Sequence, residues 1–324
     1  MILSVIISII AIFVISKNCE YLANKFGLVD RPSKNKIHKN NVALLGGAII
    51  FLILLIFLFI NYKDLYLNHY QLFYLTSFFI LGLIDDRINL NSNYKILLVI
   101  IFSSILIFLD ESFLIHKIYF EISNNEYYFG KLKIPVTLFC ILLMFIAINM
   151  SDGINCLLIS FSIFALLLIN YLIFNIPLDI LDFAIVLTLT ILIYFNYKNI
   201  IFLGNSGASL LSAYFIYKLI NKNYFIQIDV FEVISIFLIM GIDMVRLVIL
   251  RLLRKKNPFE RDLNHFHHLL LKKISLTNTI IFYLVLSFIP IIFSNIMKLP
   301  TLFFIPFTVI IYFYAVKELS KSNE

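Results

Sequence analysis

The stretch GLIDDRINLNSNYK, residues 82–95, marks the point where an apolar run ends abruptly at two adjacent carboxylates, Asp85 and Asp86. A pair of like charges where a chain leaves a bilayer requires a cation, a polar ligand or water beside it. Arg87 and Lys95 follow closely, so the simpler explanation is a solvated helix end with basic partners. The functional alternative is a site for a hard cation such as Mg²⁺, which needs few protein ligands when substrate phosphates complete its coordination. We take this pair as the chemical centre of the protein.

The composition of the chain is that of a polytopic membrane protein. The 324 residues are 61% hydrophobic and 14% charged, and the mean hydropathy is +0.97, values far from those of a soluble domain. The net charge of +7 comes from basic residues in short stretches between apolar segments, which membrane topology explains better than binding to nucleic acid. For this reason we expect no nucleic-acid partner. No linker or repeat divides residues 1–324, so we expect a single integral membrane domain.

The apolar runs predict an all-α membrane bundle of ten to eleven transmembrane helices, since about 17 to 25 apolar residues make a spanning helix. The predicted spans are residues 1–16, 43–60, 70–84, 96–109, 135–149, 156–174, 180–196, 208–220, 231–253, 277–295 and 300–316. The first has no basic residue before it and is followed by Lys17, so we expect it to remain as a span and not to be cleaved as a signal peptide.

The basic residues predict the orientation. If segment 17–42 is cytoplasmic, eighteen of the 26 Lys and Arg residues lie in inner segments and seven in outer ones, which is the inside-positive bias. The N-terminus is then outside and the C-terminus inside. The segments with unusual polar residues all fall on the cytoplasmic side, and they are 17–47, 85–95, 149–155, 197–209 and 254–276.

A second inner segment, NMSDGIN at residues 149–155, breaks a helix at Asp152 and Gly153. An Asp-Gly pair is most often a turn between two helices. Here, however, the carboxylate lies at the membrane edge between amide side chains, and Gly153 allows a ligand to approach the backbone. We therefore favour a functional site over a plain turn.

A third inner segment, FLGNSGAS at residues 202–209, is a short glycine-containing loop before the helix expected from residue 208. Such a loop directs free backbone N–H groups and the positive end of the helix dipole at an anion, as phosphate-binding loops do. The same residues also form ordinary turns, so this segment is weak evidence by itself.

The inner segment RLLRKKNPFERDLNHFHHLLLKK, residues 251–273, contains Arg261 and three histidines, His265, His267 and His268. Residues two apart do not share a helix face, and Mg²⁺ prefers oxygen to imidazole, so this pattern is a poor metal site. Arginine and histidine side by side suit a diphosphate better.

Two further pairs of residues have two possible roles each. Asp243 and Arg246 lie inside a predicted span, where they form either an i, i+3 ion pair or part of a substrate cavity. Lys36 and His38 lie in the first inner segment, where they either face anionic lipid or help to hold an anionic substrate.

Taken in order, these segments resemble the polyprenyl-phosphate N-acetylhexosamine-1-phosphate transferases, the WecA and MraY superfamily within glycosyltransferase family 4, over nearly the whole chain. The resemblance rests on five motifs in the right order on one face of the membrane. The matched residues are Lys36, His38, Gly46 and Gly47, then Asp85, Asp86 and Lys95, then Asn149, Asp152 and Gly153, then Phe202, Gly204, Gly207 and Ser209, and last Asp243, Arg251, His265, His267 and His268. The final histidine segment is more similar to the WecA-type branch than to the peptidoglycan branch.

The resemblance implies transfer of a sugar 1-phosphate, N-acetylhexosamine 1-phosphate, from a UDP-sugar to undecaprenyl phosphate, with release of UMP. The product would start a cell-envelope glycan such as the O-antigen of lipopolysaccharide. The resemblance also implies Mg²⁺, or Mn²⁺ in its place, as the cofactor, the bacterial inner membrane as the location, and a homodimer as a common state.

The resemblance also implies roles for single residues. Asp85 or Asp86 would deprotonate or orient the lipid phosphate, and Asp152 would act in catalysis and in metal or nucleotide binding. The metal ligands would be Asp86, Asp152 and Asn205. The substrate-binding residues would be Lys36, His38, Lys95, Asn149, Gly204, Arg261, His265, His267 and His268.

Three asparagines depart from the family's pattern. Asn205 stands where the glycine loop of the family carries a metal-binding Asp, and Asn89 and Asn155 replace two further acidic residues. An Asn oxygen can ligate Mg²⁺ but brings no charge, which lowers affinity. One alternative is therefore a member with weakened or lost catalysis. A second is a secondary transporter that uses Asp243 and Arg246 in a translocation path, although the polar residues gather at one face and no repeat is present.

Overall fold

The computed structural model describes residues 1–32, 40–61, 69–225, 227–258 and 262–321. Its helices are α1 (Ile2–Lys17), α2 (Cys19–Phe26), α3 (Gly46–Ile60), α4 (His69–Ile88), α5 (Ser92–Leu109), α6 (Lys133–Ser151), α7 (Leu157–Leu168), α8 (Ile180–Tyr197), α9 (Gly204–Phe225), α10 (Val230–Leu253), α11 (Phe266–Leu271), α12 (Leu276–Met297) and α13 (Ile305–Ser320). Two short antiparallel hairpins are also present: β1 (Val29–Asp30) pairs with β2 (Val42–Ala43), and β3 (Lys117–Phe120) pairs with β4 (Asn125–Tyr128). The predicted all-α class is confirmed.

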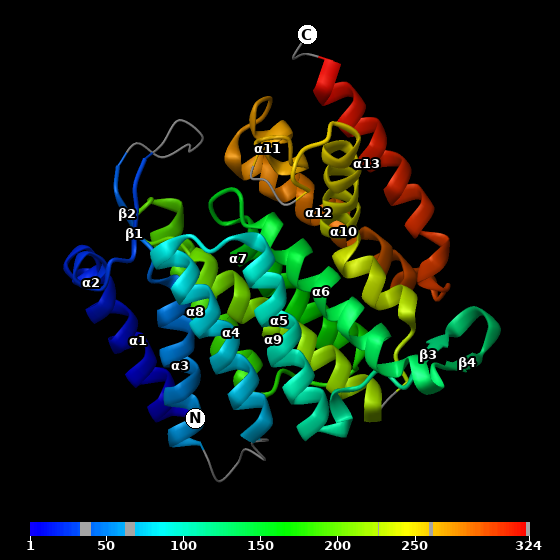
Figure 1. The fold of residues 1–324 in the computed structure, drawn as a ribbon, viewed down its shortest axis with the longest axis horizontal. Helices are drawn as coiled ribbons and strands as arrows, with labels where there is room; N and C mark the ends of the chain where they lie inside the picture. The colour runs from blue at the N-terminus through cyan, green and yellow to red at the C-terminus, as the bar shows by residue number, and fades with distance from the viewer. Residues whose placement is uncertain (33–39, 62–68, 226, 259–261, 322–324) are drawn as a thin grey trace.

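The helices form one bundle with two distinct ends (Figure 1). The β1–β2 hairpin, α11 and the C-terminus lie at one end, which we call the α11 end, and the N-terminus and the β3–β4 hairpin lie toward the other. The start of α1 and the end of α13 therefore lie at opposite ends of the bundle.

The helices confirm a polytopic membrane protein. Among the described residues, six helices are long and apolar enough to cross a membrane by themselves, namely α5, α6, α8, α10, α12 and α13. A seventh span would consist of α1 and α2 together, but these two helices are bent by 74° relative to each other. The other predicted spans form α3, α4, α7 and α9, which belong to the same bundle but are shorter or less apolar.

The central helix of the bundle is α9. All its residues from 208 to 220 are buried, and α3, α4 and α6 pack around it, α4 most extensively. The backbones approach closely where Gly47, at the start of α3, meets Gly207, because a Cβ atom on Gly47 would overlap the Gly207 nitrogen. The Gly-Gly pair noted in the sequence thus has a packing role against α9.

A buried ion cluster fixes the far end of α9 to α8. Lys218 of α9 is 6% exposed, and its ammonium lies 2.6 Å from Asp182 and 3.1 Å from Asp179. Tyr214 donates a further hydrogen bond to Asp182. Lys218 is therefore a neutralised internal charge and not a solvated residue of an outer loop.

Two helices extend beyond the ends predicted from the apolar runs. The span predicted to end at residue 84 continues as α4 to Ile88, so Asp85 and Asp86 lie in its last turn and do not open a loop. The helix expected from residue 208 begins at Gly204, so most of the predicted glycine loop is the first turn of α9. Both extensions are polar turns that find hydrogen-bond partners inside the protein.

Candidate active site

Asp85 and Asp86 contact different neighbours because successive residues of an α-helix point in directions about 100° apart. Asp85 is 2% exposed and forms an ion pair with Lys95 of α5. Its Oδ1 atom also accepts a hydrogen bond of 2.8 Å from the backbone N–H of Leu90. The structure therefore brings the first carboxylate together with the basic residue that follows it ten positions later in the sequence.

Asp86 caps the N-terminus of α9. Its Oδ1 atom accepts a hydrogen bond from the N–H of Asn205 at 2.7 Å, and its Oδ2 atom accepts one from the N–H of Ser206 at 2.9 Å. A helix N-terminus has unpaired N–H groups and a dipole that favours negative charge. The sequence suggests that these groups face a substrate anion, but the anion that binds two of them is Asp86.

Gly204 makes this cap possible. Its φ angle is +75°, and a Cβ atom on it would lie 2.7 Å from Oδ2 of Asp86. Any other residue would be strained there and would displace the carboxylate. The adjacent Asn205 side chain is half-buried and makes no hydrogen bond to another residue of the described chain. Its amide oxygen is therefore available to a ligand beside Asp86.

The other two asparagines that depart from the family pattern have structural roles. The Asn155 amide nitrogen donates hydrogen bonds to the Asn196 carbonyl at 3.0 Å and to Oδ1 of Asn199 at 2.7 Å, and an Asp carboxylate has no N–H with which to replace them. Asn89 has a φ angle of 50° just after the end of α4, a conformation that asparagine adopts more readily than most residues. Neither change affects a described contact of the carboxylate pair.

Asn149 joins α6 to α9. Its amide nitrogen donates to the Phe145 carbonyl at 2.9 Å and to the Ser212 hydroxyl at 3.3 Å. The amide group that we expected to bind substrate is therefore at least partly used within the bundle.

The Asp152-Gly153 turn packs against the histidine segment. A Cβ atom on Gly153 would overlap Nε2 of His267 and would lie 2.9 Å from Nε2 of His268. The glycine allows this contact, so two motifs far apart in the sequence meet at the α11 end. Asp152 itself is half-buried next to this contact.

His267 and His268 are uncharged at neutral pH. Burial, followed by repulsion from His265, lowers the pKa of His268 to about 4. Burial, with repulsion from the other two histidines, holds the pKa of His267 well below its usual range. His267 is 1% exposed, and neither ring nitrogen has a hydrogen-bond partner in the described part of the protein. If these imidazoles contact a diphosphate, as the sequence suggests, they do so as neutral hydrogen-bonding groups.

Asp243 of α10 anchors the histidine segment. Its carboxylate lies 2.9 Å from Nδ1 of His265 and accepts hydrogen bonds from the N–H of Phe266 at 3.2 Å and from Nη2 of Arg246 at 2.8 Å. A carboxylate can only accept, so Nδ1 of His265 is the donor and Nε2 is left for another partner. The i, i+3 pair of Asp243 and Arg246 is therefore present, and it holds the segment that carries the histidines.

Tyr312 completes this network and was missed from the sequence. Its hydroxyl accepts a hydrogen bond from Nε of Arg246 at 2.9 Å and donates one to Asp243 at 2.7 Å. Tyr312 is fully buried in α13, and a buried tyrosine hydroxyl needs a polar partner. That rule could have predicted a partner for it, but not which one, because the partner belongs to another helix.

The described residues form two groups at the α11 end. One group contains Asp85, Asp86 and Lys95 with the start of α9, and the other contains the Asp152-Gly153 turn with the histidine segment and Asp243. Lys36, His38 and Arg261 lie outside the described residues. In the described ranges, no three His, Cys, Asp or Glu side chains come together as a preformed metal site.

Comparison with known proteins finds one family model and several similar transferases. A family model described as glycosyl transferase family 4 matches residues 69–222, a range that includes the carboxylate pair and Asn205. The undecaprenyl-phosphate alpha-N-acetylglucosaminyl 1-phosphate transferase of Thermotoga maritima is 28% identical over 284 residues, which are 83% of this chain and 81% of the relative. The protein of that name from Haemophilus influenzae is 25% identical over 289 residues, 83% of this chain and 79% of the relative.

A third relative extends the similarity over almost the full length. It is a Bacillus subtilis protein described as a "probable undecaprenyl-phosphate N-acetylglucosaminyl 1-phosphate transferase", and it is 25% identical over 329 aligned positions, which cover 97% of this chain and 90% of the relative. The matches therefore cover all five motifs on which the resemblance rests. The chain is similar to glycosyl transferase family 4 over residues 69–222 and to these transferases over most of its length.

Proposed function

We propose that the protein transfers N-acetylhexosamine 1-phosphate from a UDP-sugar to undecaprenyl phosphate and releases UMP. An oxygen of the lipid phosphate forms a bond to the β-phosphorus of the UDP-sugar, and the bond from that phosphorus to the UMP oxygen breaks. The relatives' names state the acceptor and the N-acetylglucosaminyl 1-phosphate group. The observation that carries the proposal is the pair of buried carboxylates at the end of α4, within the matched region.

The two carboxylates have different tasks in this proposal. Both oxygens of Asp86 bind the N-terminus of α9, so Asp86 positions the segment that carries Asn205. Asp85 and Lys95 are then the groups that meet the lipid phosphate. A phosphate monoester has its second pKa near 6, so at neutral pH Asp85 orients the acceptor more than it deprotonates it. Lys95 offsets the charge that gathers as two phosphates approach each other.

Mg²⁺, or Mn²⁺ in its place, is the cation that we propose for this site. The carboxylates of Asp85 and Asp86 and the amide of Asn205 are oxygen donors, which a hard cation prefers. They do not make a complete site from protein groups in the described residues. They suit a cation that is bound by one or two carboxylates together with substrate phosphates, and when bound the ion would neutralise charge on the diphosphate. Gly153, the residue after Asp152, lies against the histidine segment.

An apolar groove next to the carboxylates suits the chain of the lipid acceptor. The groove has a volume of about 490 Å³ and is lined by apolar side chains of α1, α2, α3 and α4 and by Arg87. One side of α4 faces the groove with Ile80, Ile84 and Arg87, while Asp86 faces α9. Arg87 is exposed and makes no ion pair with another described residue. A lipid in this groove would bring its phosphate to Arg87, whose Cα lies only about 3.8 Å from that of Asp86.

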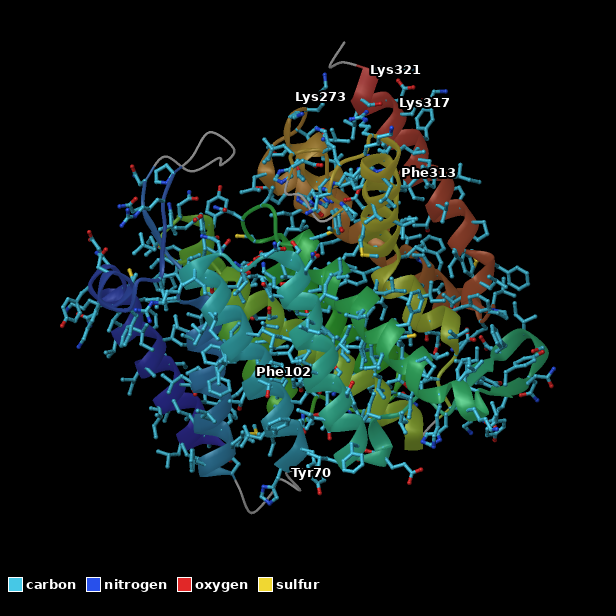
Figure 2. The ribbon with its side chains drawn as sticks, viewed as in Figure 1. Tyr70, Phe102, Lys273, Phe313, Lys317 and Lys321 are labelled. Atoms are coloured by element: carbon cyan, nitrogen blue, oxygen red, sulfur yellow. The ribbon has the colours of Figure 1, made fainter. Side chains whose placement is uncertain are left out.

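The predicted orientation places this chemistry at the cytoplasmic face of the bacterial inner membrane. Lys273, Lys317 and Lys321 lie at the α11 end of the bundle, and Tyr70 lies at the opposite end (Figure 2). This distribution supports the inside-positive assignment, with the N-terminus outside. The transporter alternative loses its main support, because Asp243 and Arg246 bind each other and Tyr312.

The test is UMP release by the purified protein with undecaprenyl phosphate, Mg²⁺ and a panel of UDP-N-acetylhexosamines. We expect turnover that depends on one sugar and on Mg²⁺ and that is lost in Asp85→Asn. Turnover only in Asn205→Asp would show a family member with a disabled cation site. No turnover in either protein, with the whole panel tested and the fold verified, would overturn the proposal.

A further inference from the structure

We propose that an anionic phospholipid binds by its headgroup in a basic pocket between α10 and α13, which shares Arg246 with the Asp243–histidine network but is not lined by the carboxylate pair. The pocket has a volume of about 240 Å³ and is formed by α10, the segment after it, α11 and α13. Its basic lining residues are Arg246, Arg251, Arg254 and Lys256, and its acidic one is Asp262. Asp85, Asp86 and Asp152 do not line it.

The pocket has an excess of positive charge. Arg246 is neutralised by Asp243, and Arg251 by Asp262. Arg254 and Lys256 are exposed at the rim and make no ion pair within the residues that the structure describes. Two unpaired cations at one opening favour an anion, and at a membrane surface the most abundant anions are lipid headgroups.

Arg251 is paired with Asp262, but its buried guanidinium is not fully hydrogen-bonded. Its side chain is 4% exposed, and its Nη1 donates to the Pro258 carbonyl at 2.6 Å. Its Nη2 lies 3.0 Å from Oδ2 of Asp262, yet it makes no well-aligned hydrogen bond to a described group. A buried guanidinium N–H without an acceptor is unfavourable. A phosphate oxygen in the pocket would supply the missing acceptor.

Most of the other lining residues are apolar, which favours a lipid over a soluble phosphate. Leu250 and Val316 line the pocket, and Leu253 and Phe313 are exposed on the same two helices, with Phe313 visible further along α13 (Figure 2). Both helices are long and apolar enough to cross a membrane. A free phosphate would use only the basic residues and a neutral lipid only the apolar walls, whereas an anionic phospholipid uses both.

The experiment measures lipid binding and needs no catalytic turnover. The full chain is delipidated in detergent, and binding of phosphatidylglycerol and phosphatidylcholine is followed by native mass spectrometry and by the shift in Tm. We expect at least a tenfold preference for phosphatidylglycerol. Arg254→Gln combined with Lys256→Gln should weaken phosphatidylglycerol binding by roughly thirtyfold, because each basic residue near an anionic lipid contributes severalfold.

The matched control is Lys272→Gln combined with Lys273→Gln, which removes two exposed charges nearby but outside the pocket. It should change phosphatidylglycerol binding by less than threefold. Phosphatidylcholine binding and Tm in its presence should be equal in all three proteins, which verifies folding. Equal losses in both double variants, or no preference between the lipids, would overturn the proposal. Displacement of phosphatidylglycerol by millimolar inorganic phosphate or UMP would instead identify a pocket for a soluble anion and would also overturn it.

Discussion

Gly153→Ala tests whether the Asp152-Gly153 turn and the histidine segment form one site. The new Cβ atom would overlap Nε2 of His267, would lie 3.0 Å from its Cε1 and would lie 2.9 Å from Nε2 of His268. Ordinary contacts are at 3.4 Å or more, so the rings or the turn must move by about 1 Å. Overpacking of this kind destabilises a protein by about 1–3 kcal/mol. A displacement of about 1 Å near reacting groups lowers a rate by about 100-fold.

The measurement is kcat and KM for UMP release, with Tm recorded for the same samples. We expect kcat to fall by about 100-fold with a small decrease in Tm. Gly241→Ala is the matched control, because nothing lies within 4 Å of its Cβ position in α10. Alanine is favoured over glycine in a helix by about 0.5–1 kcal/mol, so this variant should keep full activity and be slightly more stable. A Gly153→Ala protein with wild-type kcat would refute the contact between the two segments.

Four other changes test separate parts of the structure. Lys95→Met leaves Asp85 buried without its counter-charge, so the free energy of unfolding should fall by about 3 kcal/mol, measured as a lower Tm. Adding Asp85→Asn should restore part of this loss. Equal Tm values for the single and double variants would contradict the ion pair. Tyr312→Phe removes two hydrogen bonds and should destabilise the protein by about 2 kcal/mol. It should also shift the pH profile of kcat/KM, a change that a purely local packing defect would not produce. His268 has a pKa of about 6.5 in the unfolded chain and about 4 in the folded protein, so the unfolded state binds a proton first as the pH falls. The free energy of unfolding should therefore decrease by up to about 3 kcal/mol between these two pH values. The decrease should be smaller in His268→Gln, as denaturation at several pH values would show. Ala48→Trp fills the apolar groove and should raise the KM for the lipid but not the KM for the UDP-sugar. Initial rates measured while one substrate is varied at a fixed concentration of the other would show this difference.

The apolar runs predicted the helices well because hydrophobic length is a local property. They predicted the ends poorly. Asp85 and Asp86 are helical although the apolar run stops before them, since Lys95 and the start of α9 supply the partners that allow the helix to continue. Partners of this kind lie on other helices, so no local pattern reveals them.

The structure identifies contacts of the motif residues that the sequence did not. The glycine-containing segment was expected to bind a substrate anion, whereas two of its N–H groups bind Asp86. His267 and His268 were expected to bind a diphosphate, and the structure adds that burial keeps both rings neutral. In each case the residue type indicated that an interaction would occur, and only the tertiary arrangement identified the partner.

The position of α9 has a consequence for how the protein enters the membrane. This helix lies at the centre of the bundle, yet among the described helices it is not one of those apolar enough to cross a membrane alone. Its Lys218 would strongly disfavour insertion of an isolated helix into lipid. The helices that pack around it, α3, α4 and α6, and the two aspartates of α8 that neutralise Lys218 all precede it in the chain. During synthesis, α9 therefore leaves the ribosome after these partners, and it can insert against a surface that they already form.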